Sequence, residues 1–125
     1  MTKIIVDVIK ARNLKVCEGP NGKIDPYLQL FVGSPSNSNI QNTKSYEAKP
    51  CETIELGEYF EFNVNEEDCL NIRLYDDKEL VDGEGTGEAR IPLDEVIDNG
   101  SKKSWFKLGE GGDYCGEVLL NIHTQ

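Results

Sequence analysis

The stretch CLNIRLYDDKELVDGEGTGEARIPL, residues 69–93, joins two strand-like segments through an acidic loop. In its first part Leu70, Ile72 and Leu74 alternate with other residues, which is the pattern of a strand with one buried face. In its last part, residues 85–93 form a second strand-like run that ends at Pro92. Between them lie glycines and carboxylates, which favour a turn. The stretch therefore predicts two strands joined by a negatively charged loop.

The same strand pattern recurs along the whole chain at intervals of roughly ten residues, with turn residues between the segments. Ile4, Val6 and Val8 alternate in the first segment, and residues 93–100 could form one or two helical turns closing at Gly100. The remaining predicted strands are 26–32, 43–48, 58–64, 104–108 and 116–124. Many short strands with little helix predict an all-β fold, an eight-stranded antiparallel Greek-key β-sandwich.

The length of 125 residues predicts one domain over residues 1–125. The net charge of −10 argues against nucleic acid as a partner, and against unaided attachment to an anionic membrane. No apolar run is long enough for a transmembrane segment, and MTKIIVDVIK lacks the features of a signal peptide. We therefore expect a cytoplasmic protein with free thiols at its four cysteines.

Enzymatic residues are scarce in this sequence. His123 is the single histidine, and no G-x-S-x-G motif or comparable nucleophile pattern accompanies it. The clustered carboxylates lie on predicted solvent loops without an apolar pocket that would perturb their pKa. The sequence therefore favours a binding module over an enzyme.

Carboxylates gather in the two loops, 10–25 and 76–85, that we expect at the same end of the sandwich. Pro26 suits the first position of a strand, so Asp25 lies at the rim of the sheet. Loops rich in oxygen ligands suit Ca²⁺ better than Mg²⁺, because Ca²⁺ accepts six to eight oxygens in flexible geometry. A solvated acidic surface is the alternative. The acidic residues concerned are Glu18, Asp25, Asp76, Asp77, Glu79, Asp82 and Glu84.

Six segments in order resemble the C2 domain, a family of calcium-dependent phospholipid-binding β-sandwiches. They are IIVDVIKARNL (4–14), DPYLQL (25–30), YFEFNV (59–64), LNIRLYD (70–76), GEARIPL (87–93) and SWFKL (104–108). The order of these segments resembles the circularly permuted form of the family, called type II. The resemblance implies a single-domain, peripheral, reversible membrane-binding protein.

The resemblance also implies calcium ligands at Asp25 and Asp76, with a further carboxylate from Asp82 or Glu84. Backbone carbonyls near Asp77 and Glu18 would assist. Lys78 and Gly19 stand where the family usually has aspartates, so one weak Ca²⁺ site is expected rather than two or three ions. A one-residue slip would let Asp77 and Glu79 restore the aspartate pair, but it would break the alternation that ends at Asp76.

The family's membrane-penetrating loop tip corresponds to Leu80, with Val81 beside it. The family's basic lipid-binding face is reduced here to Lys44 and Lys49. The alternative function is a Ca²⁺-independent protein-interaction module on the same fold. We expect Trp105 and Phe106 to pack in the core, Tyr27 and Tyr75 to pack at the loop bases, and His123 to be exposed without a special role.

Overall fold

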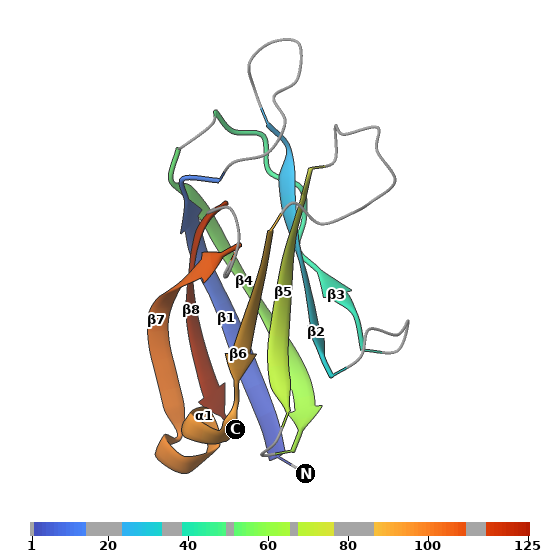
Figure 1. The fold of residues 1–125 in the computed structure, drawn as a ribbon, viewed down its shortest axis with the longest axis vertical. Helices are drawn as coiled ribbons and strands as arrows, with labels where there is room; N and C mark the ends of the chain where they lie inside the picture. The colour runs from blue at the N-terminus through green and yellow to red at the C-terminus, as the bar shows by residue number, and fades with distance from the viewer. Residues whose placement is uncertain are drawn as a thin grey trace.

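The computed structural model describes residues 2–14, 24–33, 39–49, 52–65, 68–76, 87–109 and 115–125. In these ranges the chain forms two antiparallel four-stranded sheets that face each other (Figure 1). The strands are β1 (Thr2–Arg12), β2 (Pro26–Val32), β3 (Gln41–Asn42), β4 (Ile54–Val64), β5 (Cys69–Asp76), β6 (Gly87–Pro92), β7 (Ser101–Leu108) and β8 (Gly116–Thr124). The predicted eight-stranded antiparallel sandwich is confirmed.

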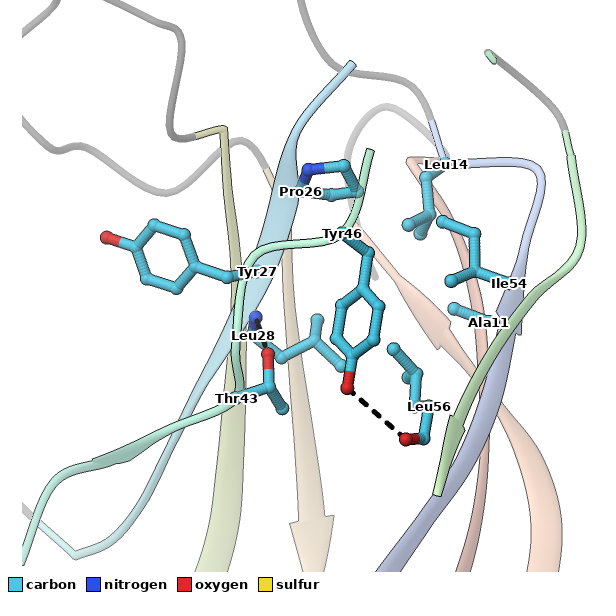
Figure 2. A pocket seen from close by; sticks show the side chains of 9 residues that line it. All are labelled: Ala11, Leu14, Pro26, Tyr27, Leu28, Thr43, Tyr46, Ile54 and Leu56. Carbon is cyan, nitrogen blue, oxygen red and sulfur yellow. Dashed lines mark hydrogen bonds between the residues drawn. The ribbon is translucent and has the colours of Figure 1, made fainter. Parts of the chain in front are cut away.

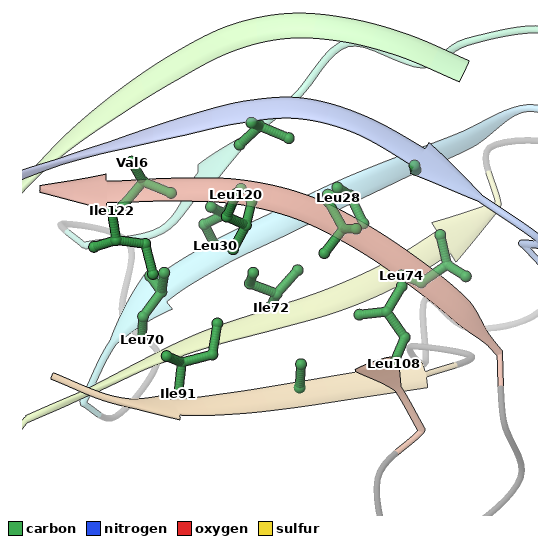
Figure 3. Packing of buried hydrophobic residues seen from close by; sticks show 14 of the residues in the cluster. Val6, Leu28, Leu30, Leu70, Ile72, Leu74, Ile91, Leu108, Leu120 and Ile122 are labelled. Atoms are coloured by element: carbon green, nitrogen blue, oxygen red, sulfur yellow. The ribbon is translucent and has the colours of Figure 1, made fainter. Parts of the chain in front are cut away.

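The two sheets bury the alternating apolar residues that defined the strands in the sequence. In β1, Ile4, Val6 and Val8 are fully buried, and in β5 Leu70, Ile72 and Leu74 are fully buried as well. Figure 3 shows Leu70 and Ile72 of β5 across the core from Leu120 and Ile122 of β8. Because alternate residues of a strand point to opposite faces, the period-two pattern located the core directly.

The strand order is β4-β1-β8-β7 in one sheet and β3-β2-β5-β6 in the other. The first described strand therefore pairs with the last one, with Ile4 opposite Thr124 and Arg12 opposite Glu117. No described strand precedes β1 in the chain. This is the type II connectivity that the resemblance implied.

The predicted third strand, residues 43–48, is wrong in position. The strand β3 is only Gln41–Asn42, and residues 43–47 follow the edge of β2 without regular pairing. The cause is local, because the Thr43 hydroxyl accepts a hydrogen bond from the Leu28 amide at 2.9 Å. Backbone bonds from Thr43 to Leu28 and from Tyr46 to Pro26 complete this irregular edge. Side-chain hydrogen bonding here replaces part of the strand ladder.

The predicted helical turns are the short helix α1, Asp94–Asn99. It buries Val96 and ends at Gly100, whose φ of 88° is the left-handed conformation common after helix ends. The helix lies at the end of the sandwich where the chain termini meet (Figure 1). The opposite end, where β1, β5 and β7 finish and β2, β6 and β8 begin, is called the loop end below.

Candidate calcium and membrane site

Asp25 lies at the loop end, between two residues whose backbones form hydrogen bonds. Ile24 exchanges two backbone hydrogen bonds with Ala48, at 2.8 and 2.9 Å, and Pro26 begins β2 while its carbonyl accepts from Tyr46 at 3.0 Å. Ile24 is fully buried and Pro26 is buried, whereas Asp25 between them is half-buried. The carboxylate is thus carried on a rigid segment at the rim of the sheet.

Asp76 ends the neighbouring strand at the same rim. In the register of β2 and β5, Asp76 stands opposite Pro26, directly beside Asp25 in the chain. The pairing of β5 with β2 stays in step from Leu70 through Ile72 and Leu74 to Asp76. The fold therefore brings the backbone positions of Asp25 and Asp76 together, although they are 51 residues apart in sequence.

The other predicted site residues lie outside the described residues. Among the described ones, no group of three or more histidine, cysteine, aspartate or glutamate side chains could hold a metal ion. The structure thus brings together the positions of two predicted ligands and does not test the remainder. Those outside the described ranges are Glu18, Asp77, Leu80, Val81, Asp82 and Glu84.

Close backbone packing supports the loop end from below. A Cβ at Gly116, where φ is +120°, would lie 2.9 Å from the carbonyl oxygens of Arg12 and Asn13. A Cβ at Gly87 would lie 2.7 Å from the Cβ of Cys115. Glycine is needed at these contacts because any side chain would force the strands apart. The start of β8 is therefore packed tightly against the end of β1.

Two tyrosines, next to the aspartate positions, form a stacked pair. The sequence analysis did not predict this pair. Tyr27 and Tyr75 stand opposite each other in the register, and their rings stack with centroids 5.3 Å apart and planes 12° apart. Both are half-buried on the outer face of their sheet, not packed in the core. The pairing follows once Pro26 and Asp76 are known to stand opposite each other. Sequence periodicity alone does not give that register.

The outer face of the β3-β2-β5-β6 sheet carries arginines in addition to the expected Lys44 and Lys49. The Arg73 guanidinium lies 4.8 Å from the centroid of the Phe31 ring and its Nε 3.7 Å from a carboxylate oxygen of Glu88. Arg73 is thus committed to contacts within its own sheet. The predicted reduction of the family's basic lipid-binding face counted Lys44 and Lys49 and left out Arg73, so it stays a prediction.

A small apolar cavity lies between the sheets beside Pro26 (Figure 2). Only about 10 Å³ is open to a water-sized molecule, roughly the room that one water needs. It is too small for a lipid chain or a cofactor. Its lining residues are Ala11, Leu14, Pro26, Tyr27, Leu28, Thr43, Tyr46, Ile54 and Leu56.

Two further predictions for individual side chains are corrected by the structure. Trp105 is half-buried on the outer face of its sheet, because the adjacent Phe106 takes the inward position and packs against the core. His123 is not without a partner, since its Nε2 lies 3.3 Å from a carboxylate oxygen of Asp7. Of the four cysteines, Cys69 and Cys115 lie within the described residues, and neither forms a disulfide.

A family model for the C2 domain matches residues 2–108. The chain belongs to the C2 domain family. It is 30% identical over 109 residues to Synaptotagmin-4 of Arabidopsis thaliana. The matched region covers 85% of this chain and 18% of that protein. The chain therefore spans less than a fifth of the length of that curated relative.

Two solved structures share the fold over nearly all of the chain. One is a C2 domain-containing protein from a putative elicitor-responsive gene, with 25% identity, a TM-score of 0.73, and coverage of 98% of this chain and 88% of that chain. The other is a C2 domain of a plant extended synaptotagmin 1, with 20% identity, a TM-score of 0.81, and coverage of 99% and 94%. These likenesses establish the sandwich architecture. Within the described ranges, no helix is long and apolar enough to cross a membrane.

Proposed function

We propose that this C2 domain binds one Ca²⁺ ion at its loop end and, through that ion, docks reversibly onto a phospholipid surface. The observation that carries the proposal is the register that sets Asp76 opposite Pro26, so that two acidic positions from separate loops meet at one rim. Carboxylate oxygens are the donors that Ca²⁺ prefers, so the residues present fit this ion. Family membership over residues 2–108 supports the same reading.

The ion would be held by Asp25 and Asp76, with a third carboxylate from Asp82 or Glu84. Glu18 and Asp77 would contribute nearby carbonyl oxygens or charge. Binding of a second ion is opposed by Lys78, which stands where the family usually has an aspartate. At an effective dielectric constant near 20, one unit charge about 5 Å away contributes about 3 kcal/mol. Replacing a negative ligand by a lysine therefore disfavours a second ion strongly.

The membrane contact would combine charge and apolar insertion. Carboxylates outnumber lysines in the two acidic loops, so the metal-free loop end is repelled by anionic lipid. A bound Ca²⁺ lowers this repulsion and offers open coordination positions to phosphate oxygens. Leu80 and Val81 at the loop tip would contribute roughly 3–5 kcal/mol if both were buried in the membrane. That amount supports reversible docking and not permanent attachment.

The domain acts in this proposal as a non-catalytic module. Its single histidine, His123, contacts Asp7 and pairs with Ser101 and Ile5, near the end of the sandwich that holds the termini. The histidine is therefore remote from the acidic rim. Activities of the longer proteins in which such domains occur are separate from this role.

Calcium titration calorimetry of the native chain and of Asp25→Asn tests the metal site. We expect one weak binding event in the native chain and its loss in the variant. Asp98→Asn, an exposed change in α1 at the opposite end, is the matched control and should bind like the native chain. Absence of binding at millimolar Ca²⁺, or tight binding of two ions, would contradict the proposal.

Liposome co-sedimentation with Ca²⁺ or with chelator tests the membrane contact. The native chain should sediment with phosphatidylserine-containing vesicles only in Ca²⁺, and Leu80→Ser/Val81→Ser should sediment less. If chelator leaves binding unchanged, or if the double variant binds as well as the native chain, the mechanism is wrong. The Ca²⁺-independent protein-interaction function would then take its place.

A further inference from the structure

The outer face of the β4-β1-β8-β7 sheet exposes an apolar pair that the core does not need. In the register, Trp105 of β7 stands opposite Leu119 of β8, and Leu119 stands opposite Lys10 of β1. Both apolar side chains are half-buried on a face that points away from the facing sheet. Tryptophan on the solvent face of a sheet is a frequent centre of protein–protein contacts.

A β-bulge in β1 brings positive charge to this pair. The pairing of β1 with both of its neighbours skips Ile9, between Val8 and Lys10. Before the bulge the even-numbered residues face the core, and after it Ala11 does, with 1% of its surface exposed. Lys10 and Arg12 are therefore turned to the outer face, because one added residue reverses the alternation. If Ile9 instead paired in a regular ladder, both cations would point inward.

Arg12 and two lysines complete a compact basic surface around the indole. The Arg12 guanidinium carbon lies 3.8 Å from the centroid of the Trp105 ring, and its Nε lies 3.4 Å from Oε1 of Glu117. Lys103 and Lys107 flank Trp105 on β7 and are exposed. Strand geometry separates these lysines by about 13 Å and separates β1 from β7 by about 10 Å. The Trp105 patch consists of Lys10, Arg12, Lys103, Trp105, Lys107 and Leu119.

Edge protection does not account for this charge. Lysines on an edge strand discourage pairing with other chains, and Lys103 and Lys107 could serve that purpose on β7. Lys10 and Arg12, however, lie on β1, which has a neighbouring strand on each side. Their outward position therefore does not protect an edge strand. The cluster also opposes the sign of the chain as a whole, whose net charge is −10.

We propose that the Trp105 patch docks an acidic protein segment in which carboxylates flank an apolar side chain. The apolar residue would rest on Trp105 and Leu119 while its acidic neighbours meet the surrounding cations. Glu117 lies inside the patch, opposite Arg12 and Lys107, and Glu55 stands opposite Lys10, so four cations meet two carboxylates there. A small segment can contact the patch alone, whereas a bilayer would also meet Asp7 and Glu61 farther along this face. Charge complementarity therefore favours a peptide over an anionic lipid surface.

The fluorescence of Trp105, the single tryptophan of the chain, reports directly on the patch. The native chain, kept in EDTA, is titrated with a synthetic peptide of aspartate and glutamate around leucine and phenylalanine. A counterpart with lysines in place of the acidic residues, and vesicles of phosphatidylserine and phosphatidylcholine, are titrated in parallel. EDTA separates this test from the calcium-dependent membrane contact proposed above. Amide chemical shifts of residues 103–107 give a second measurement.

We expect a saturable change with the acidic peptide only, at least five-fold weaker binding in Lys103→Glu/Lys107→Glu, and native binding in Lys49→Glu/Arg90→Glu. The control makes the same change in total charge with two exposed residues outside the patch. Equal weakening in both variants would show a general charge effect and overturn the proposal. A response to vesicles without a response to the peptide would make the patch a membrane contact and overturn it too. No response in either measurement would also overturn the proposal.

Discussion

Tyr46→Phe is expected to destabilise the domain, because it removes the hydroxyl that hydrogen-bonds residues of β4 from the irregular edge beside β2. The Tyr46 hydroxyl donates to the Glu58 carboxylate and lies 3.2 Å from the Leu56 carbonyl oxygen (Figure 2). Hydrogen bonds to charged groups contribute about 1.5–3 kcal/mol. We expect a loss of about 1.5 kcal/mol, at the lower end, because Glu58 retains the Lys44 amide as a donor at 3.1 Å. This loss corresponds to about 6 °C in Tm for a domain of this size.

The same contact predicts a dependence of stability on alkaline pH. Burial, and then the hydrogen bond and negative charge of Glu58, raise the pKa of Tyr46 from 10.0 to about 12. Below pH 10 the phenol is protonated in both the folded and the unfolded chain, so its stabilisation is fully present. Above pH 10 the unfolded chain loses this proton first, so the stabilisation declines as the pH rises toward about 12. The slope is at most about 1.4 kcal/mol per pH unit.

Urea unfolding of the native chain and of Tyr46→Phe from pH 7 to pH 11.5 measures both effects. The gap in the free energy of unfolding should be about 1.5 kcal/mol at pH 7 and should narrow above pH 10. Tyr59→Phe is the control, since the Tyr59 side chain is 67% exposed and should change stability by less than about 0.5 kcal/mol. A gap below about 0.5 kcal/mol at pH 7, or one that does not narrow, would refute the reasoning.

Gly116→Ala should destabilise the domain by at least about 1 kcal/mol, because the alanine Cβ would lie 2.9 Å from the carbonyl oxygens of Arg12 and Asn13. Thermal unfolding measures the loss of stability. Gly57→Ala, at positive φ with open space around it, is the comparison and should cost less. Ile72→Ala should cost about 2–5 kcal/mol, measured by urea unfolding, because its side chain is fully buried between the sheets. Adding millimolar Ca²⁺ should raise Tm, and chelator should reverse the rise, if the loop end binds the ion in the folded state alone. An unchanged Tm in this last experiment would count against the calcium site.

The core could be predicted from alternation, whereas the gathering of acidic residues at one end was predicted from the alternating connections of an antiparallel sandwich and from the family resemblance. Leu70, Ile72 and Leu74 have to share one face of a strand, and counting onward in steps of two reaches Asp76. Pro26 marked the first residue of β2, and with it the position of Asp25 at the rim. These features depend on local chemistry and on a period of two, which a sequence displays directly.

The features that sequence reasoning missed depend on register or on side-chain competition. The pairing of Tyr27 with Tyr75 needs the alignment of two distant strands. Residues 43–48 do not form the predicted strand, because the Thr43 hydroxyl accepts a hydrogen bond from the Leu28 amide. The position of Trp105 could have been found, since adjacent residues of a strand point to opposite faces and Phe106 already takes the inner one.

The bulge at Ile9 lets β1 hold one extra residue without changing the faces on which the following residues lie. Val8 stands opposite Leu120 and Lys10 opposite Leu119, so deleting Ile9 would restore a regular ladder with β8. Ala11 would remain in the core, and Lys10 and Arg12 would remain on the outer face. Homologous domains that have one residue fewer at this point would therefore keep both the core and the outer surface of β1.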